Sequence, residues 1–232
     1  MNATIPILLD TDIGSDIDDA VALAYLLRQP RCELVGITTV TGNVAQRAAI
    51  AQAVCAVAGQ PDIPVHAGAT ASLIHGIGQR EVPQFAALEG HPHRKDWPAG
   101  TAVEYLRKTI RSRPGELTLL SIGPFTNLAL LFALDPEIPR LLKEVVSMAG
   151  TFFDPMPEWN CRVDPVATVM AYAARPPRHV SVGLDVTMKC KLAADEAARV
   201  STALMSVEAR VTKLLDKADA DIEVVRRRLH EV

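Results

Sequence analysis

The sequence predicts an α/β protein with an open, mostly parallel β-sheet flanked by helices. Short apolar, β-branched runs alternate with longer helical patterns along the chain. Strands that alternate with helices in this way form a mostly parallel sheet that is covered on both faces. The chain has 232 residues, of which 49% are hydrophobic, so it can bury a substantial core. No linker or internal repeat interrupts the pattern, and we therefore expect a single domain over residues 1–232.

Six apolar runs bounded by turn residues are the expected strands, at residues 5–9, 34–39, 64–67, 117–121, 145–148 and 179–184. Helical spacing or Ala-rich composition predicts the helices, at residues 20–27, 45–57, 102–111, from 126 onward, 165–174 and 193–229. Two long loops remain, at residues 72–98 and 150–164. Long loops in compact domains are usually functional or mobile. The polar residues that follow parallel strands should gather at one edge of the sheet.

The composition argues against several classes of function. The net charge is −3 and the only Lys/Arg block is residues 226–228, so a basic nucleic-acid-binding face is not expected. No apolar run reaches membrane-spanning length, and the chain enters its first strand without a signal peptide. The four cysteines are scattered and form no C-x-x-C pair, which favours reduced thiols in a cytoplasmic protein. They are Cys32, Cys55, Cys161 and Cys190.

Five carboxylates fall within ten residues directly after the first strand, and we call residues 10–19 the acidic segment. Like charges this close repel one another, and burial strengthens the repulsion. A divalent cation would relieve it, and hard cations prefer oxygen ligands, so the pattern predicts a metal site. Helix capping is the alternative for Asp16 and Asp18. It leaves Asp10 and Asp12, at the end of a buried strand, unexplained.

A second alternative is an aspartate-dependent phosphatase. An Asp-x-Asp after a strand also marks phosphatases that use an aspartate nucleophile and Mg²⁺. That pattern has Thr or Val two residues after the second Asp, where this sequence has Gly14. The match to the phosphatase pattern is therefore incomplete.

Two further turns follow strands at the same edge of the predicted sheet. Asn43 ends a Thr-Gly-Asn turn, and it is either an ordinary turn residue or a ligand contact. Residues 121–127 join a strand to a helix, where a backbone carbonyl could face the cation. The plain interpretation of that turn places Thr126 or Asn127 near the helix N-cap.

The loop over residues 150–164 carries a polar segment before its helix. Glu158 and Asn160 are two apart and can point the same way in extended chain, which suits the recognition of hydroxyl groups. Asp164 is expected to cap the next helix, with Pro165 in its first turn. Asp185 follows the last expected strand as a capping or supporting residue.

Five motifs, in this order, resemble the inosine-uridine preferring nucleoside hydrolases, which cleave N-ribosyl bonds. They are the Asp-x-Asp-x-Gly…Asp-Asp start, the Gly-Asn turn, the Gly-Pro-x-Thr-Asn turn, the Glu-x-Asn…Asp-Pro segment and the Leu-Asp-Val-Thr segment, spread over residues 5–187. The resemblance implies an N-ribosyl hydrolase with a Rossmann-like core and a bound Ca²⁺. It also implies a small-molecule ribonucleoside as substrate and a homo-oligomer, a dimer or tetramer.

The resemblance implies a role for each matching residue. Asp12 would hold Ca²⁺ and accept the proton of the attacking water. Asp19 would be a second Ca²⁺ ligand, the backbone carbonyl of Ile122 a third, and Asp10 a support behind the metal. The residues that match ribose-binding or pocket-lining positions are Asp18, Asn43, Met148, Glu158 and Asn160. No motif fixes the group that helps the base to leave, and the candidates are His91, His93 and Trp159.

The sequence also departs from the family pattern. The first loop is two residues longer than the commonest form, so Asp16 is an extra acid and the roles of Asp16 and Asp18 could be exchanged. No His-Asp pair occurs, although the family carries one on a late helix; His230-Glu231 only resembles its start. We therefore expect a chain that is truncated at its C-terminus and binds Ca²⁺ weakly. A non-catalytic relative that binds a nucleoside or ribose stays an alternative, and base preference cannot be inferred.

Overall fold

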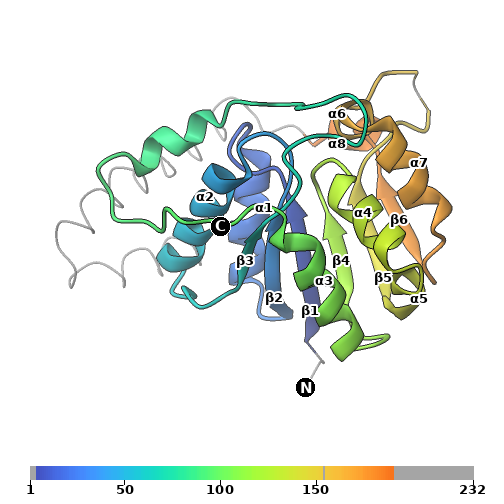
Figure 1. Cartoon of the computed structure of the whole chain (residues 1–232), viewed down its shortest axis with the longest axis horizontal. Coiled ribbons are helices and arrows are strands. Elements are labelled where there is room, and N and C mark those ends of the chain that lie inside the picture. The colour runs from blue at the N-terminus through green and yellow to red at the C-terminus, as the bar shows by residue number, and fades with distance from the viewer. Residues whose placement is uncertain (1–3, 154, 191–232) are drawn as a thin grey trace. The chain divides into compact units, whose positions relative to one another are not determined.

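The computed structural model describes residues 4–153 and 155–190 (Figure 1). One compact unit contains residues 1–86 and 93–189, and residues 87–92 are grouped with a second unit. The account below concerns the first unit. The helix expected at residues 193–229 and the pair His230-Glu231 lie outside the described residues.

A sheet of six parallel strands forms the centre of the first unit, which confirms the predicted fold class. The apolar composition of the strands explains why helices must cover both of its faces. The strands are β1 (Ile5–Thr11), β2 (Cys32–Thr39), β3 (Val65–Ala67), β4 (Thr118–Ser121), β5 (Glu144–Met148) and β6 (His179–Val182). Their order in the sheet is β3-β2-β1-β4-β5-β6.

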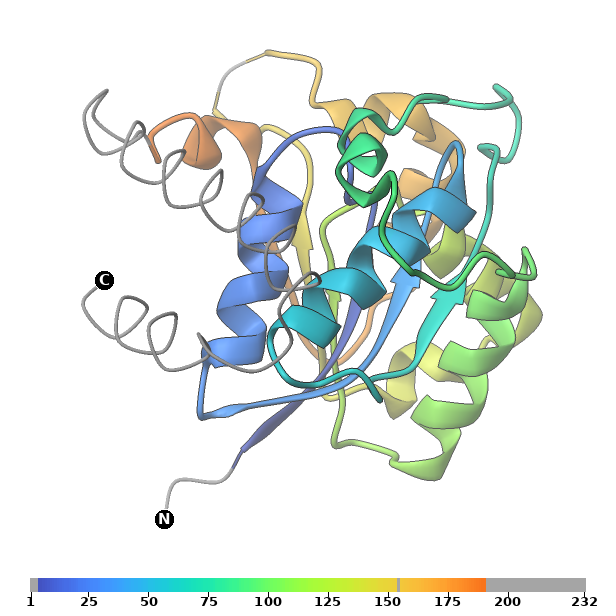
Figure 2. The same cartoon turned by 90° about the vertical axis from the view of Figure 1, so that its left-hand side faces the viewer.

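Helices lie on both faces of the sheet, as Figures 1 and 2 show. The helix α1 packs against α2 on one face, and α4 packs against α3 and α7 on the other. The longer helices are α1 (Asp18–Arg28), α2 (Val44–Val57), α3 (Thr101–Ser112), α4 (Thr126–Leu134) and α7 (Pro165–Ala173). The shorter ones are η1 (Pro83–Leu88), α5 (Ile138–Leu141), α6 (Trp159–Val163) and α8 (Leu184–Thr187).

The strand order places the acidic segment at a characteristic position. β1 pairs with β2 on one side and with β4 on the other, and Asp10 lies opposite Thr38 and Ser121 in these pairings. From β1 the chain continues through β2 and β3 on one side of the sheet, and it then crosses to β4 on the other side of β1. The strand order therefore reverses between the neighbouring strands β1 and β4. Ligands of open α/β sheets bind outside the carboxyl ends of the strands at such a switch point. The fold therefore brings the polar turns after β1, β2 and β4 to the position where a ligand is expected.

Buried apolar side chains fix the helices on the α3, α4 and α7 face. Leu8 and Leu119 of the sheet belong to one cluster with Leu106 of α3 and Leu128 of α4. Phe125, which precedes α4, is fully buried in the same cluster and contacts the ring of Tyr172 edge-on. This packing holds the start of α4, and hence the turn after β4, against the sheet.

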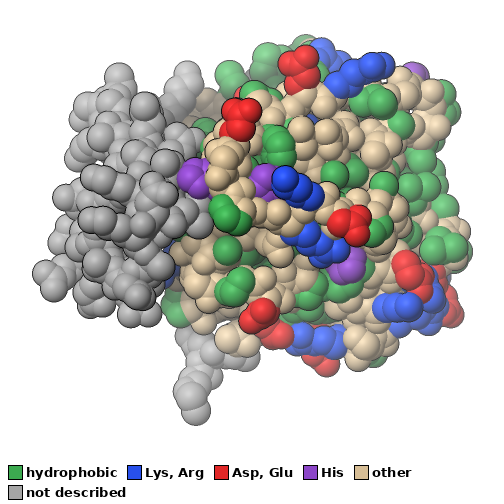
Figure 3. Space-filling model, turned by 60° about the vertical axis from the view of Figure 1, so that its left-hand side comes forward, with side chains coloured by type: hydrophobic (Ala, Val, Ile, Leu, Met, Phe, Trp, Pro, Cys, Tyr) green, Lys and Arg blue, Asp and Glu red, His purple; other side chains and the backbone are tan. Residues whose placement is uncertain are grey.

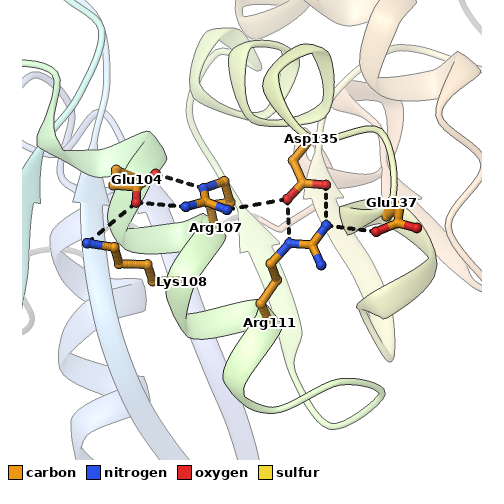
Figure 4. Close-up of polar contacts among 6 residues, drawn as sticks. All are labelled: Glu104, Arg107, Lys108, Arg111, Asp135 and Glu137. Carbon is orange, nitrogen blue, oxygen red and sulfur yellow. Dashed lines mark hydrogen bonds and ion pairs between the residues drawn. The ribbon is translucent and has the colours of Figure 1, made fainter.

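A network of charged side chains connects the surface of α3 to the connection between α4 and α5 (Figure 4). Arg111 donates two hydrogen bonds to the carboxylate of Asp135, at 2.6 and 2.7 Å, and one to Glu137 at 2.8 Å. Arg107 reaches Asp135 at 3.8 Å and pairs with Glu104 at 2.7 Å. These contacts lie on the α3 side of the sheet, away from the acidic segment.

Basic and acidic side chains are interspersed on the face drawn in Figure 3. This distribution agrees with the low net charge of −3. Among the described residues, no helix is both long enough and apolar enough to cross a membrane.

Three short elements differ from the sequence-based expectation. The last strand ends at Val182, and Leu184–Thr187 forms α8, so Asp185 lies in a helix rather than after a strand. The loop over residues 150–164 contains α6, and Asn160 is therefore helical rather than extended. The expectation that Glu158 and Asn160 point the same way in extended chain is wrong, because Glu158 caps this helix.

Candidate active site

Asp10 is a fully buried carboxylate at the end of β1. Its Oδ1 atom accepts hydrogen bonds from Thr38 Oγ1 at 2.6 Å and from Asn127 Nδ2 at 2.7 Å. Its Oδ2 atom is also buried and has no hydrogen-bond partner. Burial raises the pKa of Asp10 to about 7, although both hydrogen bonds oppose the shift. A buried carboxyl oxygen without a donor is costly, and it indicates either a bound proton or a missing cation.

Asp12 and Asp19 lie close enough to repel each other. Burial raises the pKa of Asp12 to about 6, the charge of Arg47 lowers it, and Asp18 and Asp16 raise it further. Burial also raises the pKa of Asp19 well above its usual value, and the charge of Asp12 adds to this effect. The Oδ1 atom of Asp19 accepts a hydrogen bond from Thr11 Oγ1. The two carboxylates therefore share a site in which a positive charge would be stabilised.

The turn after β4 approaches Asp12 closely. A Cβ atom on Gly123 would lie 2.9 Å from the backbone nitrogen of Asp12 and 3.1 Å from its Oδ1 atom, so only glycine fits. The neighbouring residue, Ile122, is hydrogen-bonded through its backbone nitrogen to the carbonyl of Asp10 at 2.8 Å. The structure thus brings Asp10, Asp12 and the turn at Ile122 together.

The oxygen-rich character of this group fits a hard cation. Asp12 and Asp19 offer carboxylates, and the unpartnered Oδ2 of Asp10 lies in the strand that leads to them. Among residues 4–153 and 155–190, no three His, Cys, Asp or Glu side chains gather as a complete metal-binding group. The ligand set expected from the sequence contains two carboxylates and a carbonyl, so water or substrate oxygens would have to complete it.

The carbonyl of Ile122 has a partner within the protein. It accepts a hydrogen bond from Asn160 Nδ2 at 2.8 Å, and the same nitrogen donates to the carbonyl of Met148 at 2.9 Å. A carbonyl oxygen has a second lone pair, so Ile122 can still face a cation. Asn160, only 4% exposed, joins the turn after β4 to the end of β5.

Glu158 has its carboxylate occupied by backbone donors. It accepts hydrogen bonds from the nitrogens of Asn160 at 2.7 Å, Cys161 at 2.9 Å and Gly150 at 3.1 Å. It thereby caps α6 and fixes the end of the β5 turn. Its expected contact with ribose stays a prediction, and any such contact has to share the oxygens with these donors.

The other expected ribose-binding residues lie at the start of helices or at a strand end. Asn43 caps α2 through its Oδ1 atom, which accepts from the nitrogen of Gln46 at 3.2 Å. Asp16 and Asp18 are exposed, and the residue in the N-cap position of α1 is Ile17, which makes no side-chain cap. Neither acid caps α1, but Asp18 is the first residue of that helix, where the helix dipole favours an acid, so the helix N-terminus alternative holds in part for Asp18. Met148 is the last residue of β5 and is partly buried.

The three candidates for assisting the departing base come from two segments of the chain, Trp159 from α6 and the two histidines from the loop over residues 72–98. Trp159 begins α6, is 42% exposed and lies under the guanidinium of Arg162, whose Cζ is 4.8 Å from the ring centroid. His93 meets the ring of Phe85 edge-on. His91 belongs to the segment 87–92 of the second unit. Their roles stay predictions.

The sequence-based analysis missed the supports of the site. Asn127 lies near the helix N-cap as expected, two residues after Phe125, and its side chain also donates to Asp10 and accepts from the nitrogen of Ala69 at 2.9 Å. Asp164 caps α7 as predicted, yet it also accepts from Thr126 Oγ1 at 2.7 Å. A polar pair at the start of an otherwise apolar helix was the available signal for Asn127.

Thr41, in the turn after β2, also bears on the site. It has a positive φ of 60°, which is uncommon outside glycine, and its buried Oγ1 atom has no hydrogen-bond partner. Such backbone conformations persist where the surroundings enforce them, often at functional sites.

Comparison with known proteins gives a consistent result. Residues 7–227 match the family model described as inosine-uridine preferring nucleoside hydrolase. Uridine nucleosidase 1 of Arabidopsis thaliana is 33% identical over 210 residues, which are 82% of this chain and 59% of that protein. The pyrimidine-specific ribonucleoside hydrolase RihA of Salmonella agona is 32% identical over 227 residues, which are 91% of this chain and 70% of that protein.

Solved structures agree with these matches. The purine-preferring ribonucleoside hydrolase from Gardnerella vaginalis has a TM-score of 0.68 and 28% identity, covering 79% of this chain and 62% of that one. The chain thus spans about three fifths of the length of the Gardnerella and Arabidopsis proteins.

Proposed function

Because this chain belongs to the inosine-uridine preferring nucleoside hydrolase family, we propose that it hydrolyses the N-glycosidic bond of ribonucleosides. The products are ribose and a free base. The observation that carries the proposal is the group of buried carboxylates at the switch point of the sheet, where Asp10 and Asp12 have raised pKa values. Carboxyl groups with raised pKa values mark a candidate functional site, and a cation or a cationic reaction intermediate would stabilise their charged forms.

Asp12 is the general base in this proposal. It accepts a proton from the water that attacks the anomeric carbon of the ribose. Asp12, Asp19 and the carbonyl of Ile122 would hold Ca²⁺, which supplies positive charge that lowers the pKa of water and binds vicinal hydroxyl groups. The sugar becomes oxocarbenium-like as the base departs, and the negative charge of Asp12 and Asp18 favours that state.

The surrounding residues orient the substrate in this proposal. Asp18, Asn43, Glu158 and Asn160 contact the ribose hydroxyls, and Met148 lines the sugar pocket. Asn160 is suited to a positioning role because its amide nitrogen already fixes two carbonyls, those of Ile122 and Met148.

The departing base needs a proton or a stacking surface. Trp159 offers an exposed ring, and His93 and His91 offer imidazoles as candidate proton donors. Base preference is open, and the relatives include a uridine nucleosidase and a purine-preferring hydrolase.

We further propose a cytoplasmic homo-oligomer. Among the described residues, Cys32, Cys55 and Cys161 are free thiols, which supports a reducing compartment. The apolar composition of the chain and its family resemblance support association with further copies. The alternatives are a nucleoside-binding relative without turnover and an aspartate-dependent phosphatase.

A panel assay tests the proposal. The chain is incubated with inosine, uridine and a chromogenic riboside, with Ca²⁺ or with a chelator, and reducing sugar is measured. We expect ribose release from at least one substrate, lost in the chelator. If nucleosides bind but no ribose is released, the chain is a nucleoside-binding relative without turnover. If phosphate is released from phosphomonoesters, the chain is an aspartate-dependent phosphatase.

A further inference from the structure

Arg47 is a fully buried cation whose role neither motif nor family resemblance supplies. It lies in the first turns of α2, in an Ala-rich helix, and its side chain is 0% exposed. Burying a guanidinium is expensive unless its donors are satisfied. In Arg47 all three guanidinium nitrogens donate hydrogen bonds to described atoms.

The acceptors of Arg47 belong to three different loops. Nη1 donates to the carbonyls of Asp12 and Ile13, the latter at 3.0 Å, and to Ser15 Oγ at 3.1 Å. Nε donates to the carbonyl of Thr41 at 2.8 Å, and Nη2 to that of Gln79 at 3.4 Å. The guanidinium thus joins the loop after β1, the loop after β2 and the long loop after β3.

The three loops lie in close contact with one another. A Cβ atom on Gly42 would lie 1.8 Å from the carbonyl oxygen of Gln79. A Cβ atom on Gly14 would lie 2.4 Å from Val82 Cγ1. The long loop also reaches α6, since a Cβ atom on Gly78 would lie 2.7 Å from Val163 Cγ1 (Figure 1). Arg47 is therefore the polar centre of a tight loop junction.

We propose that Arg47 is the positioning residue that holds the backbone of Asp12 in register for the hydrolysis. This inference rests on the proposed function. The acceptors of Arg47 in the loop after β1 are neutral oxygens, so the carboxylate of Asp12 stays free to face the substrate. The planar fork of arginine reaches several acceptors at fixed angles, whereas a lysine ammonium is a single point of donation.

The chain offers a matched control. Arg111, on α3, also uses Nε and Nη2 in a fixed arrangement, but its acceptors are Asp135 and Glu137 in the connection between α4 and α5 (Figure 4). Arg111→Lys removes the same guanidinium geometry far from the acidic segment. If Arg47→Lys lowers kcat and Arg111→Lys does not, the loss is due to the position of Arg47. It is then not a general effect of replacing a guanidinium.

The test compares Arg47→Lys, Arg111→Lys and the unmodified chain in steady-state kinetics and in amide hydrogen exchange. For Arg47→Lys we expect kcat to fall roughly 100-fold with little change in KM, as for a misplaced base. We also expect faster exchange confined to residues 12–16 and 79–80. Arg111→Lys should leave kcat and these amides unchanged. An Arg47→Lys variant with unaltered kcat, or with faster exchange throughout the sheet, would overturn the positioning role.

The unmodified chain gives a second measurement that does not depend on a folded variant. The Nη protons of Arg47 should give separate, slowly exchanging NMR signals, because five hydrogen bonds hinder rotation of the guanidinium. Averaged, fast-exchanging signals would overturn the inference. If the unmodified chain cleaves no riboside, the proposed function fails, while the exchange and NMR measurements still decide whether Arg47 fixes the loop.

Discussion

Asp12 is the residue on which the proposed chemistry depends. It is 8% exposed, it neighbours the turn after β4, and its own carbonyl is bound by Arg47. Its carboxylate is set in place by the backbone around it. A general base needs such placement more than it needs an unusual pKa.

Asp12→Asn keeps the shape of the side chain and removes its basicity. We expect turnover to fall by about 10²–10⁴-fold, the usual contribution of a general base, while the melting temperature is retained. Asp96→Asn is the matched control, because it makes the same change at an exposed acid outside the acidic segment. Equal ribose release by the two variants would remove the assignment of Asp12 as the base.

Asp10 should make stability depend on pH when no cation is present. Its pKa is about 7 in the folded chain and near 4 when unfolded, so folding favours its protonated form. Its contribution to stability is full below about pH 4 and is lost as the pH rises through 7.

Asp10→Asn removes this dependence. We compare the melting temperatures of this variant and of the unmodified chain in the presence of a chelator. The variant should become more stable relative to the unmodified chain between pH 5 and pH 8, by at most about 3 kcal/mol of unfolding free energy. The exposed acid Asp96 gives the control Asp96→Asn, for which no such rise is expected. A pH-independent difference for Asp10→Asn would show that Asp10 does not carry the shift.

At the scale of elements, Asp164 connects three parts of the chain. Its Oδ1 atom caps α7 by accepting from the nitrogen of Ala167 at 2.9 Å. Its Oδ2 atom accepts from Thr126 Oγ1 at the start of α4 and from the nitrogen of Leu73 in the long loop. One fully buried carboxylate thus fixes the turn after β4 against α7.

Asp164→Ala should cost about 3–4 kcal/mol of unfolding free energy, since it removes a helix cap and leaves two buried donors unpaired. Asn43→Ala removes only the exposed cap of α2 and should cost about 1 kcal/mol. Denaturant unfolding of both variants measures the difference. Similar losses in the two would mean that Asp164 acts as a simple cap.

The long, periodic or apolar elements could be predicted from the sequence, and the short ones could not. All six strands follow from apolar runs bounded by turns, because a buried parallel strand has no other composition. The helices α6 and α8 have five and four residues, too few for a periodic pattern. The start of α6 depends on Glu158, whose carboxylate also binds Gly150 across the loop.

The acids of the candidate site could be located from the sequence, but their supports could not. Asp10 and Asp12 stand out because acids rarely end a buried strand. Asn127 binds Asp10 across 117 positions of the chain, and Arg47 binds Asp12 across 35. Such partners depend on the strand order, which a motif does not contain. An arginine within an Ala-rich helix was the only local signal for Arg47.

For the whole molecule, the strand order explains why these distant residues meet. The reversal between β1 and β4 brings the turns after β1, β2 and β4 to one edge of the sheet. The chain spans 59% of the Arabidopsis relative and 62% of the Gardnerella one. Its affinity for a cation therefore has to be measured on this chain and not taken from the longer relatives. We expect that affinity to be weak, because the ligand set contains only two carboxylates and a carbonyl.

Calorimetric titration of Ca²⁺ into the unmodified chain and into Asp12→Asn tests the central claim most directly, namely that a cation occupies the group formed by Asp12 and Asp19. We predict weak, saturable binding to the unmodified chain, and its loss in Asp12→Asn. Binding of equal affinity in both chains, or no saturable binding in the unmodified chain with Ca²⁺, Mg²⁺ or Mn²⁺, would contradict the account.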